Sequence, residues 1–203
     1  MGIRSENLEG ESLVPTPPTP SPAVLAPLVD HLRRHALRTD GPFVLASGAV
    51  SDWYLDARRT TFDGEGARLV GEAVASVLHD DVDVVGGMTM GADPIAVATA
   101  IVATGDGRPL RAFSVRKEPK DHGTGGRLVG PVTPGDRACV LEDTTTTGAA
   151  LVEAVDALEA AGVPVVQAVA LVDRSGETVA ALLADRGIPY LPLIRPVDLG
   201  IGA

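Results

Sequence analysis

Val140-Leu141-Glu142-Asp143-Thr144-Thr145-Thr146-Thr147-Gly148-Ala149-Ala150 is the most informative stretch of the sequence. An apolar run ends in two acids, four threonines follow, and a glycine precedes a helix-like segment. The N–H groups at a helix start bind anions, hydroxyls add donors, and glycine allows a close backbone approach. Adjacent carboxylates can accept bonds from ribose hydroxyls or orient magnesium through water. The stretch therefore predicts a strand, a loop and a helix that hold a ribose phosphate.

The alternative interpretation is an ordinary strand followed by a capped helix, with both acids solvated. Four successive threonines argue against it, because threonine is a poor helix former and such a run needs another role. We therefore favour the ribose-phosphate site.

Strand-like and helix-like segments alternate on both sides of this stretch. Predicted strands cover residues 82–85, 110–115, 137–141, 165–172 and 190–194. Predicted helices cover residues 67–78, 94–102, 149–161 and 178–186. This alternation implies an α/β fold with a central, mostly parallel sheet flanked by helices. Ligands bind such sheets in the loops beyond the carboxyl ends of the strands. Those loops are residues 86–91, 116–130, 142–148 and 173–176.

The chain before this alternation divides into two parts. Residues 1–22 are acidic and then proline-rich, which favours a disordered tail and does not match an export signal. Residues 23–62 combine an amphipathic helix with short β-prone stretches at 43–45 and 53–55, which suggest a hairpin. We expect them to form a small N-terminal flap subdomain, with residues 63–203 as the core.

Composition restricts the class of protein. A formal net charge of -10 and a pI near 4.7 argue against nucleic-acid binding through general electrostatics. No apolar run reaches the roughly 20 residues needed to cross a membrane. The single cysteine, Cys139, lies in an apolar run typical of a buried residue and offers no zinc-ligand set. We expect a soluble, cytoplasmic protein with neither nucleic acid nor a membrane as partner.

One segment concentrates positive charge: Arg116-Lys117-Glu118-Pro119-Lys120-Asp121-His122-Gly123-Thr124-Gly125-Gly126. Cations beside glycines can form a mobile lid, which gathers diphosphate oxygens as charge builds on a leaving group and excludes water. The alternative is a solvated loop balanced by Glu118 and Asp121. Its position directly after a predicted strand favours the lid.

Together, the two segments resemble orotate phosphoribosyltransferases of the type I phosphoribosyltransferase family. Residues 140–150 are similar to the family's motif for 5-phosphoribosyl 1-diphosphate (PRPP), and residues 116–126 resemble its catalytic loop. The resemblance covers essentially the whole chain after the tail. It implies a type I phosphoribosyltransferase fold and a pentosyl transfer from magnesium-bound PRPP to orotate, which yields orotidine 5'-monophosphate and diphosphate in pyrimidine synthesis. It also implies a homodimer whose lid serves the neighbouring subunit.

The resemblance assigns residue roles. Lys120 and Asp143 are the expected catalytic residues. Expected PRPP contacts come from the lid and the motif: Arg116, Lys117, Lys120, His122, Glu142, Asp143, Thr144, Thr145, Thr146, Thr147, Gly148, Ala149 and Ala150. Expected orotate contacts are Thr146, Arg174 and Tyr54. No protein ligand set is assigned to Mg²⁺, which is expected to be held mainly through PRPP.

Arg174 matches the position where relatives hold the orotate carboxylate, and an arginine fork suits a planar carboxylate. The alternative is a surface arginine paired with Asp173 or Glu177. In the flap, Tyr54 or Trp53 can stack on the pyrimidine. For Trp53, plain core packing is an equal alternative.

The segment 86–94 looks like the family's diphosphate-contacting loop, in which glycines permit unusual backbone angles. The sequence departs from some relatives at Ala46 and at Thr89-Met90, where they carry cationic contacts, and at Glu142, where many have aspartate. We therefore expect the lid to carry more of the diphosphate binding.

Two rival functions are a phosphoribosyltransferase for a purine or uracil and a PRPP-sensing regulator without turnover. The lid sequence and Arg174 disfavour the first, because a neutral base has no carboxylate to capture. Overall acidity disfavours the second, because a regulator needs a basic face for RNA or DNA.

Overall fold

The computed structural model describes residues 18–44, 48, 50–119 and 126–201. Its helices are α1 (Pro22–His35), α2 (Arg58–Thr61), α3 (Gly64–Ala75), α4 (Ala92–Gly105), α5 (Ala149–Ala160), α6 (Thr178–Ala184) and the 3-10 helix η1 (Pro196–Leu199). Its strands are β1 (Leu37–Arg38), β2 (Phe43–Val44), β3 (Val50–Ser51), β4 (Tyr54–Leu55), β5 (Val84–Met88), β6 (Arg111–Val115), β7 (Leu128–Val129), β8 (Ala138–Thr145), β9 (Val165–Asp173) and β10 (Tyr190–Ile194). None of the helices in these ranges is both long and apolar enough to span a membrane.

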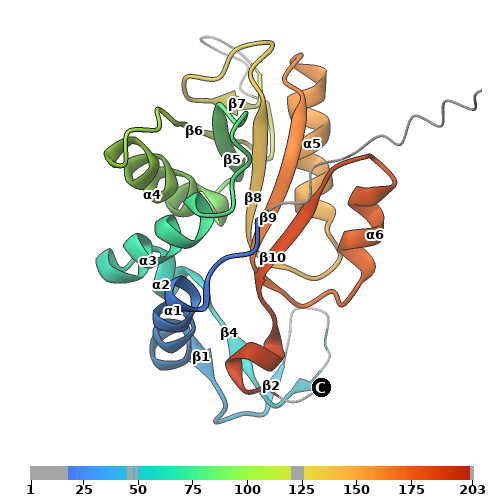
Figure 1. Cartoon of the computed structure of the whole chain (residues 1–203). Coiled ribbons are helices and arrows are strands. Elements are labelled where there is room, and N and C mark those ends of the chain that lie inside the picture. Colours follow the sequence, from blue (N-terminus) through green and yellow to red (C-terminus); the bar gives the residue numbers. More distant parts are fainter. Residues whose placement is uncertain (1–17, 45–47, 49, 120–125, 202–203) are drawn as a thin grey trace, which may run out of the picture.

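A six-stranded sheet in the order β10-β9-β8-β5-β6-β7 forms the centre of the molecule. Its strands are parallel except for β7, which runs antiparallel to β6. Helices cover both faces, with α1, α3 and α4 on one side and α5 and α6 on the other (Figure 1). The predicted α/β fold with a mostly parallel sheet is confirmed.

Side-chain alternation along the central strands builds one apolar core on each face of the sheet. In β8, Cys139 and Leu141 pack toward α1, α3 and α4, whereas Ala138 and Val140 pack toward α5 and α6. Cys139 is fully buried, as predicted, and burial raises the pKa of its thiol. The cores leave the loops at the strand ends to form sites.

The helix starts follow from local chemistry. Pro22 occupies the first turn of α1, where a missing amide donor costs nothing. The Asp63 carboxylate caps α3 by accepting from the N–H groups of Glu65 and Gly66, at 3.0 and 2.9 Å. Residues 1–17 of the predicted tail lie outside the described residues.

The predicted hairpin between residues 43–45 and 53–55 is wrong in its pairing. β2 pairs with β3, whereas β4 pairs with β1 directly after the first helix. This arrangement buries Leu55 against the core that contains α1. Leu55 therefore joins the main core, and the division of the chain at residue 62 stays a prediction.

The prediction that Gly86 and Gly87 lie in a loop is wrong, because both glycines lie inside strand β5. A Cβ at Gly86 would lie 2.2 Å from the carbonyl oxygen of Phe113, and one at Gly87 would lie 2.1 Å from that of Leu141. These glycines therefore allow close packing within the sheet, and neither has a positive φ.

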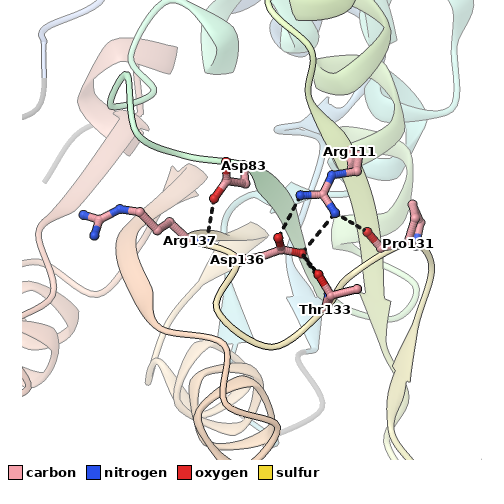
Figure 2. Close-up of polar contacts among 6 residues, drawn as sticks. All are labelled: Asp83, Arg111, Pro131, Thr133, Asp136 and Arg137. Atoms are coloured by element: carbon pink, nitrogen blue, oxygen red, sulfur yellow. Dashed lines mark hydrogen bonds and ion pairs between the residues drawn. The ribbon is translucent and has the colours of Figure 1, made fainter.

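At the amino ends of the strands, a group of charges is fully paired; we call it the amino edge (Figure 2). The Arg111 guanidinium donates to both carboxylate oxygens of Asp136, at 2.9 and 3.0 Å, and to the carbonyl of Pro131. Asp136 also accepts from the N–H and hydroxyl of Thr133. The hydrogen bond from Arg111 lowers the pKa of Asp136. The network fixes the start of β8 relative to β6.

Candidate active site

The main cavity lies beyond the carboxyl ends of β5, β6 and β8, as the fold predicts, and has a volume of about 760 Å³. It is lined by Arg58, Met88, Thr89, Met90, Gly91, Lys117, Glu142, Asp143, Ala149, Ala150 and Glu153. A smaller hollow of about 210 Å³ shares part of this lining. It is lined by Glu142, Thr144, Thr145, Thr146, Thr147, Gly148, Ala149, Ala150 and Leu151.

The smaller hollow is built around the start of α5. Gly148 precedes this helix with a φ of 78°, a left-handed conformation that a side chain would strain. Among the described residues, Gly148 offers no side chain to cap the helix, and the N–H of Ala149 makes a long contact of 3.4 Å with Thr147 Oγ1. Thr146 and Thr147 are exposed. The backbone N–H groups and hydroxyls can therefore bind an anion here.

Thr145 differs from the threonines that follow it. It is buried in β8, and its hydroxyl donates to Asp173 Oδ1 at 2.8 Å and lies 3.1 Å from the Tyr190 hydroxyl. The side chain therefore joins β8 to β9 and β10, and the fold already occupies its hydroxyl. Asp173 also accepts from the N–H of Ser175 at 2.8 Å.

The acid pair lies within β8, which extends four residues beyond the predicted end of the strand. Glu142 is buried, and its Oε2 has no hydrogen-bond partner among the described residues. Burial, followed by the neighbouring Asp143 charge, raises the pKa of Glu142 to about 8. Asp143 Oδ1 accepts from the N–H of Thr144 at 2.7 Å. The pair can accept hydroxyl donors or lie beside a cation.

Gly91 allows the close approach of the next loop to this pair. A Cβ at Gly91 would lie 2.8 Å from Asp143 Oδ1. In the same loop, the hydroxyl of Thr89 donates to Asp93 Oδ2 at 2.7 Å, while Met90 is exposed. The loop therefore forms a wall of the main cavity, without a cation at positions 89 and 90.

The two ends of the predicted lid are joined beside the main cavity. Arg116 N–H donates to the Arg127 carbonyl at 2.8 Å, and Arg127 Nε donates back to the Arg116 carbonyl at 2.7 Å. Arg127 also pairs with Glu153 of α5 and contacts the Met88 sulfur at 3.8 Å. We call these contacts the lid stem. Lys117 is exposed on the cavity wall, while the predicted residues Lys120 and His122 lie outside the described residues.

Arg174 lies at the end of β9, with its backbone N–H donating to the Thr145 carbonyl at 2.9 Å. Its guanidinium carbon lies 4.1 Å from the centroid of the Trp53 ring. Within the described ranges its side chain pairs with neither Asp173 nor Glu177, and its Nε is buried without a partner. Arg174 thus stays available to a ligand.

A third cavity, of about 260 Å³, borders Arg174. It is lined by Asp173, Arg174, Gly176, Arg195, Pro196, Val197 and Ile201. Tyr54, predicted to bind orotate, is 38% exposed, and its ring centroid lies 5.9 Å from that of Phe43. The structure thus places Trp53, and not Tyr54, on Arg174.

Sequence reasoning missed Arg58 and Glu153, which line the main cavity, and Arg127, which pairs with Glu153. Arg58 donates to Asp56 at 2.8 Å, and this bond, with a smaller effect of Asp143, raises the pKa of Arg58. No short motif contains these residues. Only the tertiary contacts bring them to the site.

Comparisons with known proteins give the family. No protein-family model matches the chain. An orotate phosphoribosyltransferase of Streptomyces avermitilis is 46% identical over 162 residues, which cover 79% of this chain and 89% of the relative. The crystal structure of Mycobacterium tuberculosis H37Rv orotate phosphoribosyltransferase with Fe(III) dicitrate matches with a TM-score of 0.79 and 36% identity, covering 87% and 99% of the two chains. The complex of that enzyme with PRPP matches with a TM-score of 0.72 and 33% identity, covering 87% and 99%. With this fold and this identity over most of its length, the chain belongs to the orotate phosphoribosyltransferase family.

Proposed function

We propose that this chain transfers the ribose 5-phosphate of PRPP to orotate, giving orotidine 5'-monophosphate and diphosphate in pyrimidine biosynthesis. The observation that carries the proposal is the start of α5, with the exposed hydroxyls of Thr146 and Thr147, beside an acid pair of which Glu142 is buried. A ribose phosphate presents one anionic group and two hydroxyls, and these complement the two features.

Each part of the substrates has a matching group. The 5-phosphate is bound by Thr146, Thr147 and the N–H groups from Gly148 to Ala150. Glu142 and Asp143 accept hydrogen bonds from the ribose hydroxyls. Arg116 and Lys117 face the diphosphate, and Arg174 holds the orotate carboxylate. Thr144 and Thr145 end strand β8, and the Thr145 hydroxyl is already bonded to Asp173, so these two residues contribute by positioning the threonines that follow.

Catalysis then rests on position and charge. The bond from the anomeric carbon to diphosphate breaks as orotate, already an anion, attacks that carbon, so no dedicated general base is needed. Negative charge develops on the leaving diphosphate, and lid cations that meet it there lower the barrier. We assign this role to Lys120 and, with it, His122.

Magnesium is the expected cofactor, and the acid pair suits it. Glu142 Oε2 is a buried acceptor without a partner within the described ranges, beside the Asp143 carboxylate. The same ranges contain no cluster of three or more potential metal-ligating side chains. Magnesium commonly binds through substrate phosphates and one or two carboxylates, and would supply charge neutralisation of the diphosphate.

A second copy of the chain is the expected partner. Val97 and Ile101, one helical turn apart on α4, are 52% and 68% exposed, and Phe62 and Met90 are 60% and 61% exposed. Met90 also lines the main cavity. A homodimer that covers Met90 would bring the partner subunit to the main cavity, as a lid that serves the neighbouring subunit requires.

The decisive experiment supplies purified protein with PRPP, Mg²⁺ and a panel of bases, and follows base absorbance. Orotate should be consumed at least about a hundredfold more efficiently than uracil, hypoxanthine or adenine, because a neutral base leaves Arg174 unpaired. Comparable use of uracil would contradict the assignment. Arg174→Ala should impair orotate use and leave PRPP binding nearly intact, whereas equal loss of both would remove Arg174 from the base site.

Mixing two inactive variants tests the shared lid. In a trans arrangement, a hybrid of Lys120→Ala and Asp143→Asn subunits contains one site with both groups intact, so activity should return after subunit exchange. In a cis arrangement no intact site can form. Lys120→Ala alone should depress turnover far more than PRPP binding, because its interaction strengthens as charge develops. Hybrids verified by native mass measurement but without activity would exclude the trans arrangement.

A further inference from the structure

Trp53 and Arg174 come from distant parts of the chain and stack on one another. Trp53 is half-buried and packs against the core of the α1 face. The Ser51 hydroxyl donates to the Trp53 carbonyl at 2.7 Å and accepts from the Trp53 N–H at 3.4 Å. Arg174 is fixed by its backbone bond to Thr145. Both partners of the stack are therefore held by their own backbones.

The stack determines which part of the guanidinium a ligand can reach. The guanidinium carbon lies over the indole ring, 4.1 Å from its centroid, so the ring shields one side of the guanidinium. The N–H donors of a guanidinium lie in its plane, and a carboxylate binds along the planar edge. Desolvation lowers the pKa of Arg174, and its Nε is buried without a partner among the residues described. The ring thus restricts the directions from which a ligand can reach the guanidinium donors.

We propose that Trp53 is a positioning residue that sets the plane of Arg174 for the carboxylate of the base, and so sets the preference for a carboxylate-bearing pyrimidine over a neutral one. The inference rests on the proposed function of Arg174. It differs from direct stacking of Trp53 on the pyrimidine and from a packing role alone. If the Arg174 guanidinium is already held in its binding orientation, it loses less side-chain conformational entropy when the carboxylate binds.

The first test compares two substitutions at position 53. Trp53→Leu keeps apolar volume and removes the ring, so KM for orotate should rise about fivefold to thirtyfold. KM for PRPP should stay within about twofold, because Trp53 does not line the smaller hollow proposed to bind the ribose phosphate. Trp53→Phe keeps a ring face and should restore most of the orotate affinity. Equal effects on both substrates, or no rescue by Phe, would indicate packing alone.

The second test is a double-mutant cycle with Arg174→Ala. If Trp53 acts through Arg174, Trp53→Leu should change KM for orotate by less than about twofold once the arginine is absent. Additive losses would overturn the inference. A wild-type protein that does not use orotate would instead contradict the proposed function, so the two failures are distinguishable.

A third readout does not require turnover. Trp53 is the single tryptophan of the chain, so its fluorescence reports on this stack alone. Orotate, with absorbance corrected, should change the emission of the wild-type protein, and uracil should not. In Arg174→Ala the orotate response should disappear. A response that persists would mean that the base contacts the indole directly and would overturn the inference. This titration also decides the matter if Trp53→Leu fails to fold.

Discussion

The two edges of the same sheet treat their charges in opposite ways. At the amino edge, Asp136 accepts four hydrogen bonds, from Arg111 and Thr133 (Figure 2). At the carboxyl edge, buried polar atoms of Asp93, Glu142, Asp173 and Arg174 have no partner within the described ranges. A buried polar group without a partner is costly, so a protein retains it only for a reason. The paired charges of the amino edge stabilise the fold, whereas the function proposed above assigns ligands to Glu142 and Arg174 at the carboxyl edge.

The largest expected effect is at the carboxyl edge. Asp143→Asn removes a charge that the proposed function places at the ribose hydroxyls, and kcat/KM for PRPP should fall about tenfold to a hundredfold. The melting temperature should move by no more than about 2 °C, because the side chain lies at the cavity and not in an apolar core. Steady-state kinetics measures kcat/KM, and calorimetry with PRPP and magnesium measures the affinity. Thermal unfolding, the control, measures the melting temperature. Unchanged affinity and rate would return Asp143 to a structural role.

The matched substitution at the amino edge should show the reverse. Asp136→Ala leaves Arg111 without its carboxylate, and the free energy of unfolding should fall by about 2 kcal/mol. Turnover measured well below the melting temperature should stay within about twofold of the wild type. Denaturant unfolding and steady-state kinetics separate the two quantities. A large loss of turnover in folded protein would show that the edges are not independent.

The two edges should also respond to pH with opposite sign. The depressed pKa of Asp136 contributes stability above the ordinary carboxyl range, which is lost as pH falls through its folded-state pKa. Glu142, with a pKa raised to about 8, holds a proton that the unfolded chain has lost, so its contribution falls as pH rises from about 4.3 toward 8. The difference in unfolding free energy between wild type and Glu142→Gln should therefore fall with pH, by at most about 1.4 kcal/mol per unit. A difference that does not change over this range would contradict the raised pKa.

The smallest expected effect divides the carboxyl edge itself. Thr145→Val removes the hydroxyl that bonds to Asp173, and should cost about 1 kcal/mol of stability while KM for PRPP stays within about threefold. Thr146→Val, on an exposed neighbour, should instead raise KM for PRPP with little effect on stability. Chemical denaturation and PRPP kinetics on the two variants provide the comparison. Equal effects on KM would place both hydroxyls at the ligand.

The sequence predicted the five parallel strands of the sheet and the helices between them, because apolar periodicity reflects burial. It did not predict β7, which lies within residues 116–130, a segment predicted to be a loop. The predicted strand ended at Leu141, because the acids and threonines that follow are typical of loops. In the structure, pairing with β9 continues to Thr145 and Asp173, and this tertiary pairing overrides the local composition. The flap strands are two residues long, too short to show a period, and their partners were assigned incorrectly.

The candidate site divides in the same way. Residues 140–150, which we propose to bind the ribose phosphate, are continuous in sequence, so their residue types alone predicted that chemistry. Arg127 and Glu153 are 26 residues apart, and Trp53 meets Arg174 only in the folded chain. Such contacts depend on how helices and strands pack, and no spacing rule within one segment predicts them.

The lid stem limits how far a residue between its ends can lie from Arg116. Lys120 follows Arg116 by four residues, and a fully extended chain advances at most about 3.6 Å per residue. The Cα of Lys120 therefore stays within about 14 Å of the Cα of Arg116, whichever way the segment turns. Hydrogen bonds to Arg127 tie Arg116, the centre of this sphere, to the stem. Lys120 can reach a leaving group in the partner subunit only if the distance from the Arg116 Cα to that group is no more than this limit plus the length of one lysine side chain. The separation of the two stems thus determines whether a lid can act across a dimer.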